Sequence, residues 1–309
     1  MRPSRRVQRR RSLRATAAVV AVSLALGLAA CGTAADRPGT NSAAAPGIGA
    51  APGNTGEALD GVATEQAPVY WVGTGDQSGY LFREFGDPED TSTADPVARA
   101  AAMVTQSTPE DPDYRTLWSP VGTVGTSVSP DGTITVDLPA AAFSTQLSEK
   151  DARLALQQMV YTVSAAAVTA GLLDASTAKE VRILVDGQSG FKAFGSVDLS
   201  QPLTRDSSLA APVWLIDPQT DSNPGSPLTL YLRALPVVHD VRWEVLQGDR
   251  TVKSGKVQAA SPGTDPTVGT ELRTTLELDP GDYRIKVTGT DDHGTEFSDD
   301  HVITVQPAG

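Results

Sequence analysis

The stretch VGTSVSPDGTITVDL, residues 124–138, contains the clearest structural signal in the chain. Two β-rich runs, 124–129 and 133–138, flank the turn Pro130-Asp131-Gly132. In the second run apolar and polar residues alternate, so one face of the strand is expected to be buried and the other wet. This pattern predicts a β-hairpin.

Two helices are predicted on either side of this hairpin. Asp95 is a suitable N-cap for the first helix, and Pro96 fits the first turn, where the missing N–H has no helical partner. Ser148 with Asp151 three residues later resembles a capping box and opens the longest helix, which Gly171 ends.

Strands are predicted at 68–73, 80–85 and 180–187. The order of elements is therefore strand, strand, helix, hairpin, helix, strand. This order predicts an α+β domain whose helices pack on one face of a mixed sheet.

Beyond Leu203 the pattern changes to seven short strands separated by turns, which is typical of a β-sandwich. Trp243 lies on the third of them with Val241 and Val245 on the same face, as expected for the centre of a core. The segment Asp279-Pro280-Gly281-Asp282-Tyr283 resembles the turn before a tyrosine corner. The predicted strands are 212–216, 228–234, 240–246, 251–259, 271–278, 283–289 and 301–306.

The amino-terminal residues predict export and anchoring. Seven arginines without an acidic residue precede the small and apolar run 15–30, which is the pattern of a signal peptide over residues 1–30. Ala29-Ala30-Cys31 resembles a lipobox, and Cys31 is the only cysteine. We therefore expect Cys31 to be lipidated, palmitate being among the acyl groups expected, and to anchor the protein outside the bacterial cell membrane. An ordinary signal peptide with an incidental cysteine is the alternative, and export by the general or the twin-arginine route stays open.

Composition limits the partners of the exported chain. The whole chain has 25 basic and 37 acidic residues, and seven of the basic ones precede Cys31, so 18 face 37 afterwards, a net charge of −19. Such a surface disfavours nucleic acid, whose binding requires clustered Lys and Arg. Residues 31–66 have few large apolar residues, which predicts a disordered tether.

The α+β region resembles the GerMN domain of sporulation and spore germination lipoproteins, which also occurs in envelope lipoproteins of bacteria that form no endospore. The segments that carry the resemblance are Val69-Tyr70-Trp71-Val72 and the runs 119–123, 131–138, 158–162 and 181–187. Residues 208–307 resemble the immunoglobulin-like Gmad2 domain that accompanies GerMN domains. The expected fold class is α+β, with a small mixed-sheet GerMN-like domain at 67–200 followed by an all-β immunoglobulin-like sandwich at 208–307.

Residues for catalysis or metal binding are few. The histidines His239, His293 and His301 all lie in the second domain, where we expect half-exposed positions at turns or strand starts and no catalytic residue. The triplets 291–293 and 299–301, each Asp-Asp-His, are candidate oxygen ligands for Ca²⁺, although solvated acidic turns are the simpler interpretation. No metal or cofactor site is predicted.

The resemblance implies a non-enzymatic envelope protein that binds a protein partner or assists assembly, with oligomeric state open. A glycan or solute binder is the alternative, and it would show a deep interdomain pocket lined by Trp71, Trp118 or Trp214. A cell-wall hydrolase is a third possibility. Tyr70 and Trp71 are adjacent on one strand, and we expect both to be covered by the helices or by Tyr114 and Trp118.

Overall fold

The computed structural model describes residues 66–87, 93–178, 180–257 and 269–307. All of them belong to one compact unit within Asn54–Gly309. The predicted signal peptide, Cys31 and all but the last residue of the predicted tether lie outside the described residues. In the described part of the chain, no helix combines the length and the apolar character that crossing a bilayer requires.

The α+β region contains two three-stranded sheets. The first has the order β2-β1-β3 and is antiparallel, whereas the second has the order β4-β5-β6 and is mixed, because β5 pairs parallel with β6. A short antiparallel pair, β7 and β8, follows. The strands are β1 (Ala67–Gly73), β2 (Leu81–Gly86), β3 (Tyr114–Arg115), β4 (Gly125–Val128), β5 (Thr133–Leu138), β6 (Glu180–Val185), β7 (Lys192–Ala193) and β8 (Val197–Asp198).

The two predicted helices are present with their predicted caps. The side chain of Asp95 accepts hydrogen bonds from the first turn of α1 (Pro96–Gln106), and that of Ser148 accepts from the first turn of α2 (Glu149–Thr169). Gly171 follows α2 with a φ of +67°, a conformation that favours glycine. Among the described residues there are also three short 3₁₀ helices: η1 (Gly75–Gln77), η3 (Ala140–Phe143) and η4 (Ser207–Leu209).

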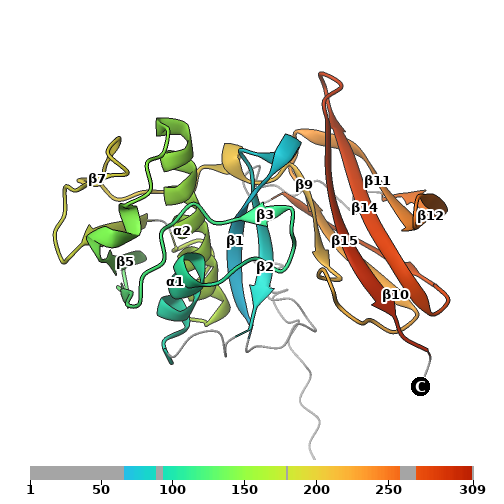
Figure 1. Cartoon of the computed structure of the whole chain (residues 1–309), viewed down its shortest axis with the longest axis horizontal. Coiled ribbons are helices and arrows are strands. Elements are labelled where there is room, and N and C mark those ends of the chain that lie inside the picture. Colours follow the sequence, from blue (N-terminus) through green and yellow to red (C-terminus); the bar gives the residue numbers. More distant parts are fainter. Residues whose placement is uncertain (1–65, 88–92, 179, 258–268, 308–309) are drawn as a thin grey trace, which may run out of the picture. The chain divides into compact units, whose positions relative to one another are not determined.

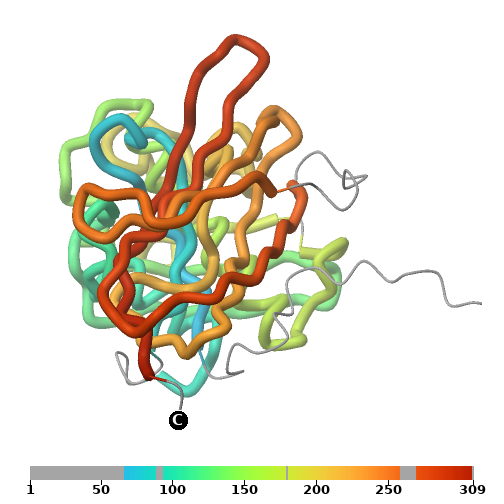
Figure 2. The backbone as a smooth tube through the Cα atoms, turned by 90° about the vertical axis from the view of Figure 1, so that its right-hand side faces the viewer, coloured from blue at the N-terminus to red at the C-terminus, as the bar shows by residue number. Residues whose placement is uncertain are grey.

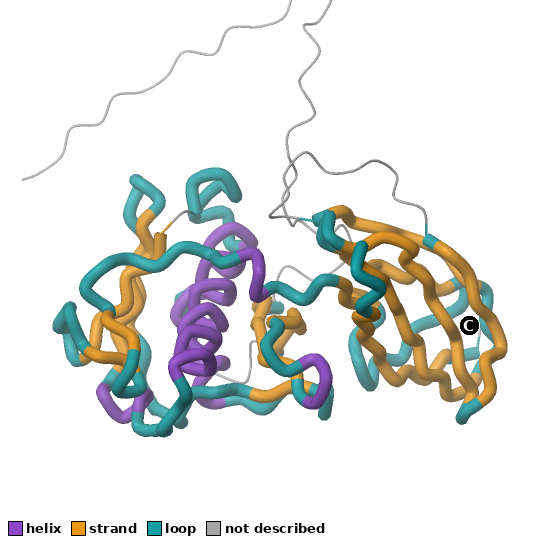
Figure 3. The backbone as a smooth tube through the Cα atoms, turned by 90° about the horizontal axis from the view of Figure 1, so that it is seen from above, coloured by secondary structure: helices purple, strands orange, loops and turns teal. Residues whose placement is uncertain are grey.

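The helices lie between the two sheets (Figures 1 and 3). The α+β class is confirmed, but the predicted arrangement on one face of a single sheet is wrong. Every residue of α2 from 154 to 167 is buried, so this helix needs neighbours on all sides. One sheet can cover only one side of a helix, and the second sheet covers the other.

The predicted hairpin forms β4 and β5, and its turn explains the glycine. Gly132 has a φ of +92°, and a Cβ at this position would lie 1.9 Å from the carbonyl oxygen of Thr177. A side chain there would therefore displace the segment before β6.

The remaining strands form the predicted β-sandwich, with the sheets β13-β10-β9 and β12-β11-β14-β15, both antiparallel. All seven predicted strands are present, although residues 258 and 259 lie outside the described part. The last strand begins five residues before the predicted start, so His301 lies in its middle. The strands are β9 (Val213–Asp217), β10 (Leu228–Ala234), β11 (Val238–Gln247), β12 (Arg250–Lys256), β13 (Thr270–Leu276), β14 (Gly281–Asp291) and β15 (Glu296–Val305).

Two predicted features of the sandwich core are confirmed. Trp243 is buried with Val241 and Val245 on one face of β11, and it lies opposite Gly255, where a Cβ would come within 2.6 Å of the indole ring. The hydroxyl of Tyr283 donates to the carbonyl oxygen of Asp279 at 3.1 Å, which is the bond of a tyrosine corner.

The sheet that contains β9 and β10 is apolar on both faces. Leu215 and Leu232 face the sandwich core, whereas Trp214, Ile216 and Tyr231 pack with the core of the α+β region. This sheet is thus a wall shared by two cores. The domain boundaries at residues 200 and 208 stay predictions.

Candidate functional site: a buried polar cluster

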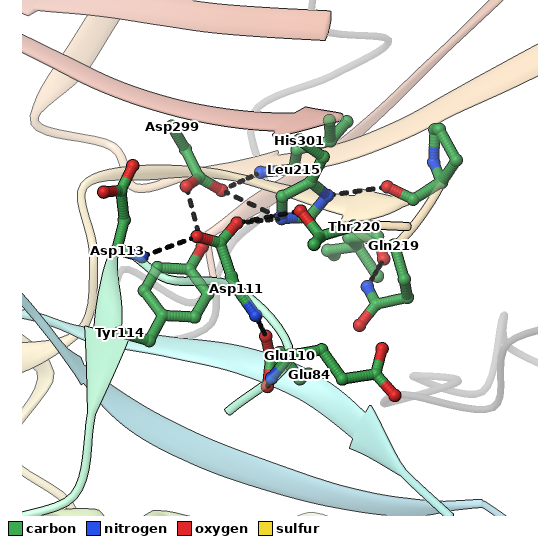
Figure 4. A network of polar contacts seen from close by, with 12 residues as sticks. Glu84, Glu110, Asp111, Asp113, Tyr114, Leu215, Gln219, Thr220, Asp299 and His301 are labelled. Atoms are coloured by element: carbon green, nitrogen blue, oxygen red, sulfur yellow. Dashed lines mark hydrogen bonds and ion pairs between the residues drawn. The ribbon is translucent and has the colours of Figure 1, made fainter. Parts of the chain in front are cut away.

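Six polar side chains meet where the α+β region contacts the sandwich (Figure 4). We call them the joint cluster, and each is at most 6% exposed. Two segments of the α+β region and two segments of the sandwich supply them. The members are Glu84 of β2, Asp111 and Tyr114 around the start of β3, Thr220 after β9, and Asp299 and His301 of β15.

The alternation of β15 places two of these residues. Phe297, Asp299, His301, Ile303 and Val305 lie at every second position, and the last two belong to the sandwich core. Because alternate residues share a face of a strand, Asp299 and His301 also point inward. The expectation of a half-exposed His301 at a strand start is therefore wrong: the side chain is 1% exposed.

Asp299 links the two regions directly. Its Oδ1 accepts a hydrogen bond from the hydroxyl of Tyr114 at 2.7 Å, and its Oδ2 accepts one from the N–H of Leu215 at 2.8 Å. Burial raises the pKa of Asp299 to about 6, although the nearby His301 acts in the opposite direction. Burial and the charge of Asp299 raise the pKa of Tyr114 well above its ordinary value, so the phenol keeps its proton.

Asp111 and Glu84 form a second layer of hydrogen bonds. Asp111 accepts from the hydroxyl of Thr220 at 2.9 Å and from the N–H of Asp113 at 2.8 Å. Glu84 accepts from the N–H of Asp111 at 2.8 Å and from the N–H of Glu110 at 3.2 Å. Burial raises the pKa of Glu84 to about 7 despite these bonds.

His301 lies between two carboxyl groups. Its Nδ1 is 2.6 Å from the carbonyl oxygen of Pro218, which can only accept, so Nδ1 is the donor. Its Nε2 is 3.9 Å from Oδ2 of Asp111 and 3.9 Å from Oδ2 of Asp299. These approaches are attractive when a proton sits on Nε2 or on one of the carboxyl groups.

The burial of the cluster limits what it can do chemically. A base must come within hydrogen-bond reach of a substrate, and solvent does not reach these side chains. Across the described ranges, no group of three or more His, Cys, Asp or Glu side chains has the arrangement to hold a metal ion. The arrangement is suited to joining the two regions.

The other candidate residues are exposed and dispersed. His293 and the preceding Asp291 lie at the turn of the β14–β15 hairpin, where Asp291 accepts from the N–H groups of His293 and Thr295. This hairpin extends beyond the neighbouring strands (Figure 2). Asp299 pairs with Val287, well down the hairpin from its turn, so the structure does not bring the two Asp-Asp-His triplets together.

The tryptophans that could mark a ligand pocket are all covered. Trp71, Trp118 and Trp214 are buried, and so is Tyr70, as predicted. A cavity of about 60 Å³ lies beside the joint, lined by residues that include Tyr80, Phe82 and Phe297. A wider hollow of about 590 Å³ lies at the tyrosine corner, between Arg250 and Asp279.

One regularity of the sequence could have revealed the cluster. Asp299 and His301 are two positions apart, in step with the apolar residues Ile303 and Val305, so their burial could have been inferred from a longer strand. The partners Glu84, Asp111 and Tyr114 lie 185 or more residues away, and no local pattern connects them to β15.

Comparison with known proteins identifies the α+β region. Residues 68–190 match the Germane family, described as sporulation and spore germination. This match confirms the GerMN resemblance, whereas the resemblance of residues 208–307 to Gmad2 stays a prediction. No curated protein sequence matches the chain.

Solved structures give more distant similarities. The first GerMN domain of the Bacillus subtilis sporulation protein GerM has 14% identity and a TM-score of 0.35, over 45% of this chain and 97% of that one. The tandem GerMN domains of the same protein have 13% identity and a TM-score of 0.36, over 69% of this chain and 61% of that one. The fibronectin(III)-like modules of Clostridium thermocellum CbhA have 18% identity and a TM-score of 0.23, over 31% and 99%. Residues 68–190 of the chain are thus similar to the Germane family, described as sporulation and spore germination.

Proposed function

We propose that the chain is a non-enzymatic, lipid-anchored envelope protein that binds a protein partner during assembly of the envelope or the spore. The Germane domain supports the link to sporulation and germination. The observation that carries the binding role is the closed joint. Where a solute binder would have a cleft between domains, this protein has buried tryptophans and a polar cluster sealed from solvent.

The size of the cavity beside the joint favours a protein partner over a solute. Pockets for small ligands usually measure about 300–1,000 Å³. The cavity at the joint measures about 60 Å³, which holds little more than water. The hollow of about 590 Å³ is large enough, but Tyr283, the aromatic residue of its lining, uses its hydroxyl for the tyrosine corner.

The positions of the histidines support a role without catalysis. His301 is sealed inside the joint cluster, and the side chain of His239 is exposed and lies 3.6 Å from Asp292. Neither has a nucleophilic side chain among the hydrogen-bond partners described above. A hydrolase would need such a pair at the surface.

In this proposal the membrane anchor is attached at Cys31. A thioether-linked diacylglyceryl group together with an amide-linked acyl chain gives stable membrane attachment, because a single chain binds only reversibly. The protein would then act at the outer face of the cell membrane, with its two domains presented beyond residue 66.

Photo-crosslinking in intact cells tests the proposed partner. A photoreactive amino acid replaces Leu172 on the Germane domain or Val302 on β15, two large apolar side chains that are exposed to solvent. We expect a discrete protein adduct from at least one position. The matched control carries the same probe with Cys31→Ala, which should lose both the adduct and the incorporation of labelled palmitate.

Other outcomes decide between the alternatives. An adduct that muramidase converts to the size of the uncrosslinked protein would favour a glycan binder. If a third probe at Val237, also exposed, and the first two all give no protein adduct, the partner hypothesis is wrong. Palmitate incorporation that persists after Cys31→Ala would contradict the anchor.

A further inference from the structure

The joint cluster contains more acidic groups than it can neutralise. Its members include three carboxyl groups, those of Glu84, Asp111 and Asp299, and one imidazole, that of His301. With every group ionised, the cluster carries two uncompensated negative charges in a buried space. Burying a charge without a partner is costly, so protonation of one or two carboxyl groups stabilises the closed joint.

The charged groups around the cluster do not remove this excess. Glu84 faces the carboxylates of Glu110 and Asp111, which both raise its pKa. Asp299 faces Asp111 and the phenol of Tyr114, with His301 as the opposing positive group. Arg83 is next to Glu84 in the sequence, but its guanidinium stacks on the ring of Phe85. Because alternate residues share a face of a strand, Arg83 and Phe85 lie on the face of β2 opposite to that of Glu84.

Groups further out complete this environment. Burial raises the pKa of Asp217 of β9, and the nearby His301 acts in the opposite direction. Asp300, on the other face of β15, is near Asp113 and Asp111 and is partly balanced by Arg284 and Lys286 of β14. The basic residues thus face Asp300 on the outer side, whereas the inner side holds carboxyl groups.

We propose that the joint cluster is a proton-operated latch, which holds the β-sandwich firmly against the Germane domain while Glu84 and Asp299 are protonated and loosens as these two carboxyl groups ionise. The bonds across the joint come from both sides: Tyr114 donates to Asp299, and Thr220 donates to Asp111. Asp299 therefore supplies both a contact across the joint and, once ionised, a buried negative charge that weakens the closed state.

The direction follows from proton linkage. The pKa values of Glu84 and Asp299 are raised to about 7 and about 6 in the closed state. The closed state therefore binds protons more tightly than an open state in which water solvates the carboxylates, and rising pH favours opening. The apolar contacts of Trp214 and Ile216 do not titrate, so they limit the opening to a loosening.

Hydrogen–deuterium exchange of the full chain tests the latch. The peptide 213–217 contains the N–H of Leu215, which donates to Asp299, and the peptide 243–247 in the second half of β11 serves as the internal reference. After correction for the intrinsic exchange rate, we expect protection of the first peptide to fall about tenfold or more between pH 5.5 and 8. Protection of the reference peptide should fall less than that of the first peptide.

Two variants separate the latch from a general effect of charge. Glu84→Gln with Asp299→Asn replaces both groups by neutral isosteres, and the protection at 213–217 should no longer depend on pH. Asp240→Asn removes an exposed carboxylate of β11 and should keep the response of the wild-type protein. If the double variant does not fold, the comparison of the two peptides in the wild-type protein at pH 5.5 and 8 still tests the latch.

The latch is wrong if protection at 213–217 in the wild-type protein is the same at both pH values. It is also wrong if the two peptides lose protection equally, because that result indicates global destabilisation. A folded double variant that retains the full pH response would overturn the assignment to Glu84 and Asp299. These outcomes do not depend on whether the chain has a protein partner.

Discussion

Asp299 and Asp240 belong to the same four-stranded sheet, yet their surroundings differ completely. Asp299 on β15 is buried in the joint cluster, and its pKa is raised to about 6. Asp240 on β11 is exposed and accepts from Lys256 at 2.7 Å and from Arg242 at 2.6 Å, and these two bonds lower its pKa to about 2. The same side chain thus responds in opposite directions, because burial dominates at one position and cationic partners dominate at the other.

The difference also predicts how much each residue contributes to folding. Water can replace the partners of Asp240, so removing its charge leaves no buried group without a hydrogen bond. Water cannot reach the partners of Asp299. The hydroxyl of Tyr114 and the N–H of Leu215 would lose their acceptor together.

The largest expected effect is that of Asp299→Ala. Two buried donors lose their acceptor and a small cavity forms, which should lower the free energy of unfolding by about 3–4 kcal/mol. Urea denaturation of the full chain at pH 6 measures it. The control is Asp240→Asn, since asparagine tolerates the φ of +56° at this position, and it should change the urea midpoint much less than Asp299→Ala.

An Asp299→Ala variant as stable as the wild-type protein would show that the joint contributes little to folding. In that case the hydrogen bonds of the cluster only replace bonds to water. A large effect of Asp240→Asn would instead show that the ion pairs of β11 are more important than their exposure suggests.

The next effect is that of pH. Because the pKa values of Glu84 and Asp299 are raised, the folded state keeps protons that the unfolded chain releases, and stability falls as pH rises from about 5 to 8. The expected loss is about 3 kcal/mol. Asp240 has a lowered pKa, so its contribution is constant over this range and is lost only as pH falls toward 2. Thermal or urea midpoints at pH 5, 6, 7 and 8 measure the slope.

Stability that rises steadily over this pH range would contradict the raised pKa values. The variant with Glu84→Gln and Asp299→Asn sharpens the test, because its midpoint should vary less with pH than that of the wild-type protein.

The smallest expected effect on the free energy of unfolding is that of Tyr283→Phe, which follows from a comparison of two tyrosines. Tyr114 donates to a buried carboxylate, whereas Tyr283 donates to the carbonyl oxygen of Asp279 near the surface of the sandwich. Tyr283→Phe should therefore cost about 1 kcal/mol, the usual value for a neutral hydrogen bond. Urea denaturation measures it, and a cost above that of Asp299→Ala would reverse the ranking of the two regions.

Most secondary structure could be predicted because its causes are local. Asp95-Pro96 and Ser148 start helices through bonds to the next three residues, and the alternation in 133–138 marks a strand wherever it occurs. The arrangement of the sheets around α2 could not be predicted. Burial of residues 154–167 on all sides depends on two separate sheets, which no local pattern in the helix specifies.

The joint cluster shows the same division. The residue types of Asp299 and His301 suggested solvated positions, because charged residues are rarely fully buried. Their burial results from Tyr114, Asp111 and Thr220, which the fold brings to β15 from other segments.

The sequence by itself determined the main helices and strands, the α+β region followed by a sandwich, the tyrosine corner and the match of residues 68–190 to the Germane family. Only the tertiary structure decided that β9 and β10 serve two cores and that three acidic side chains share a dry space with His301. The physical reason is the distance along the sequence over which each kind of interaction acts. Caps, turns and alternation act over a few residues, whereas burial and the pKa values it shifts depend on what the folded chain places around each side chain.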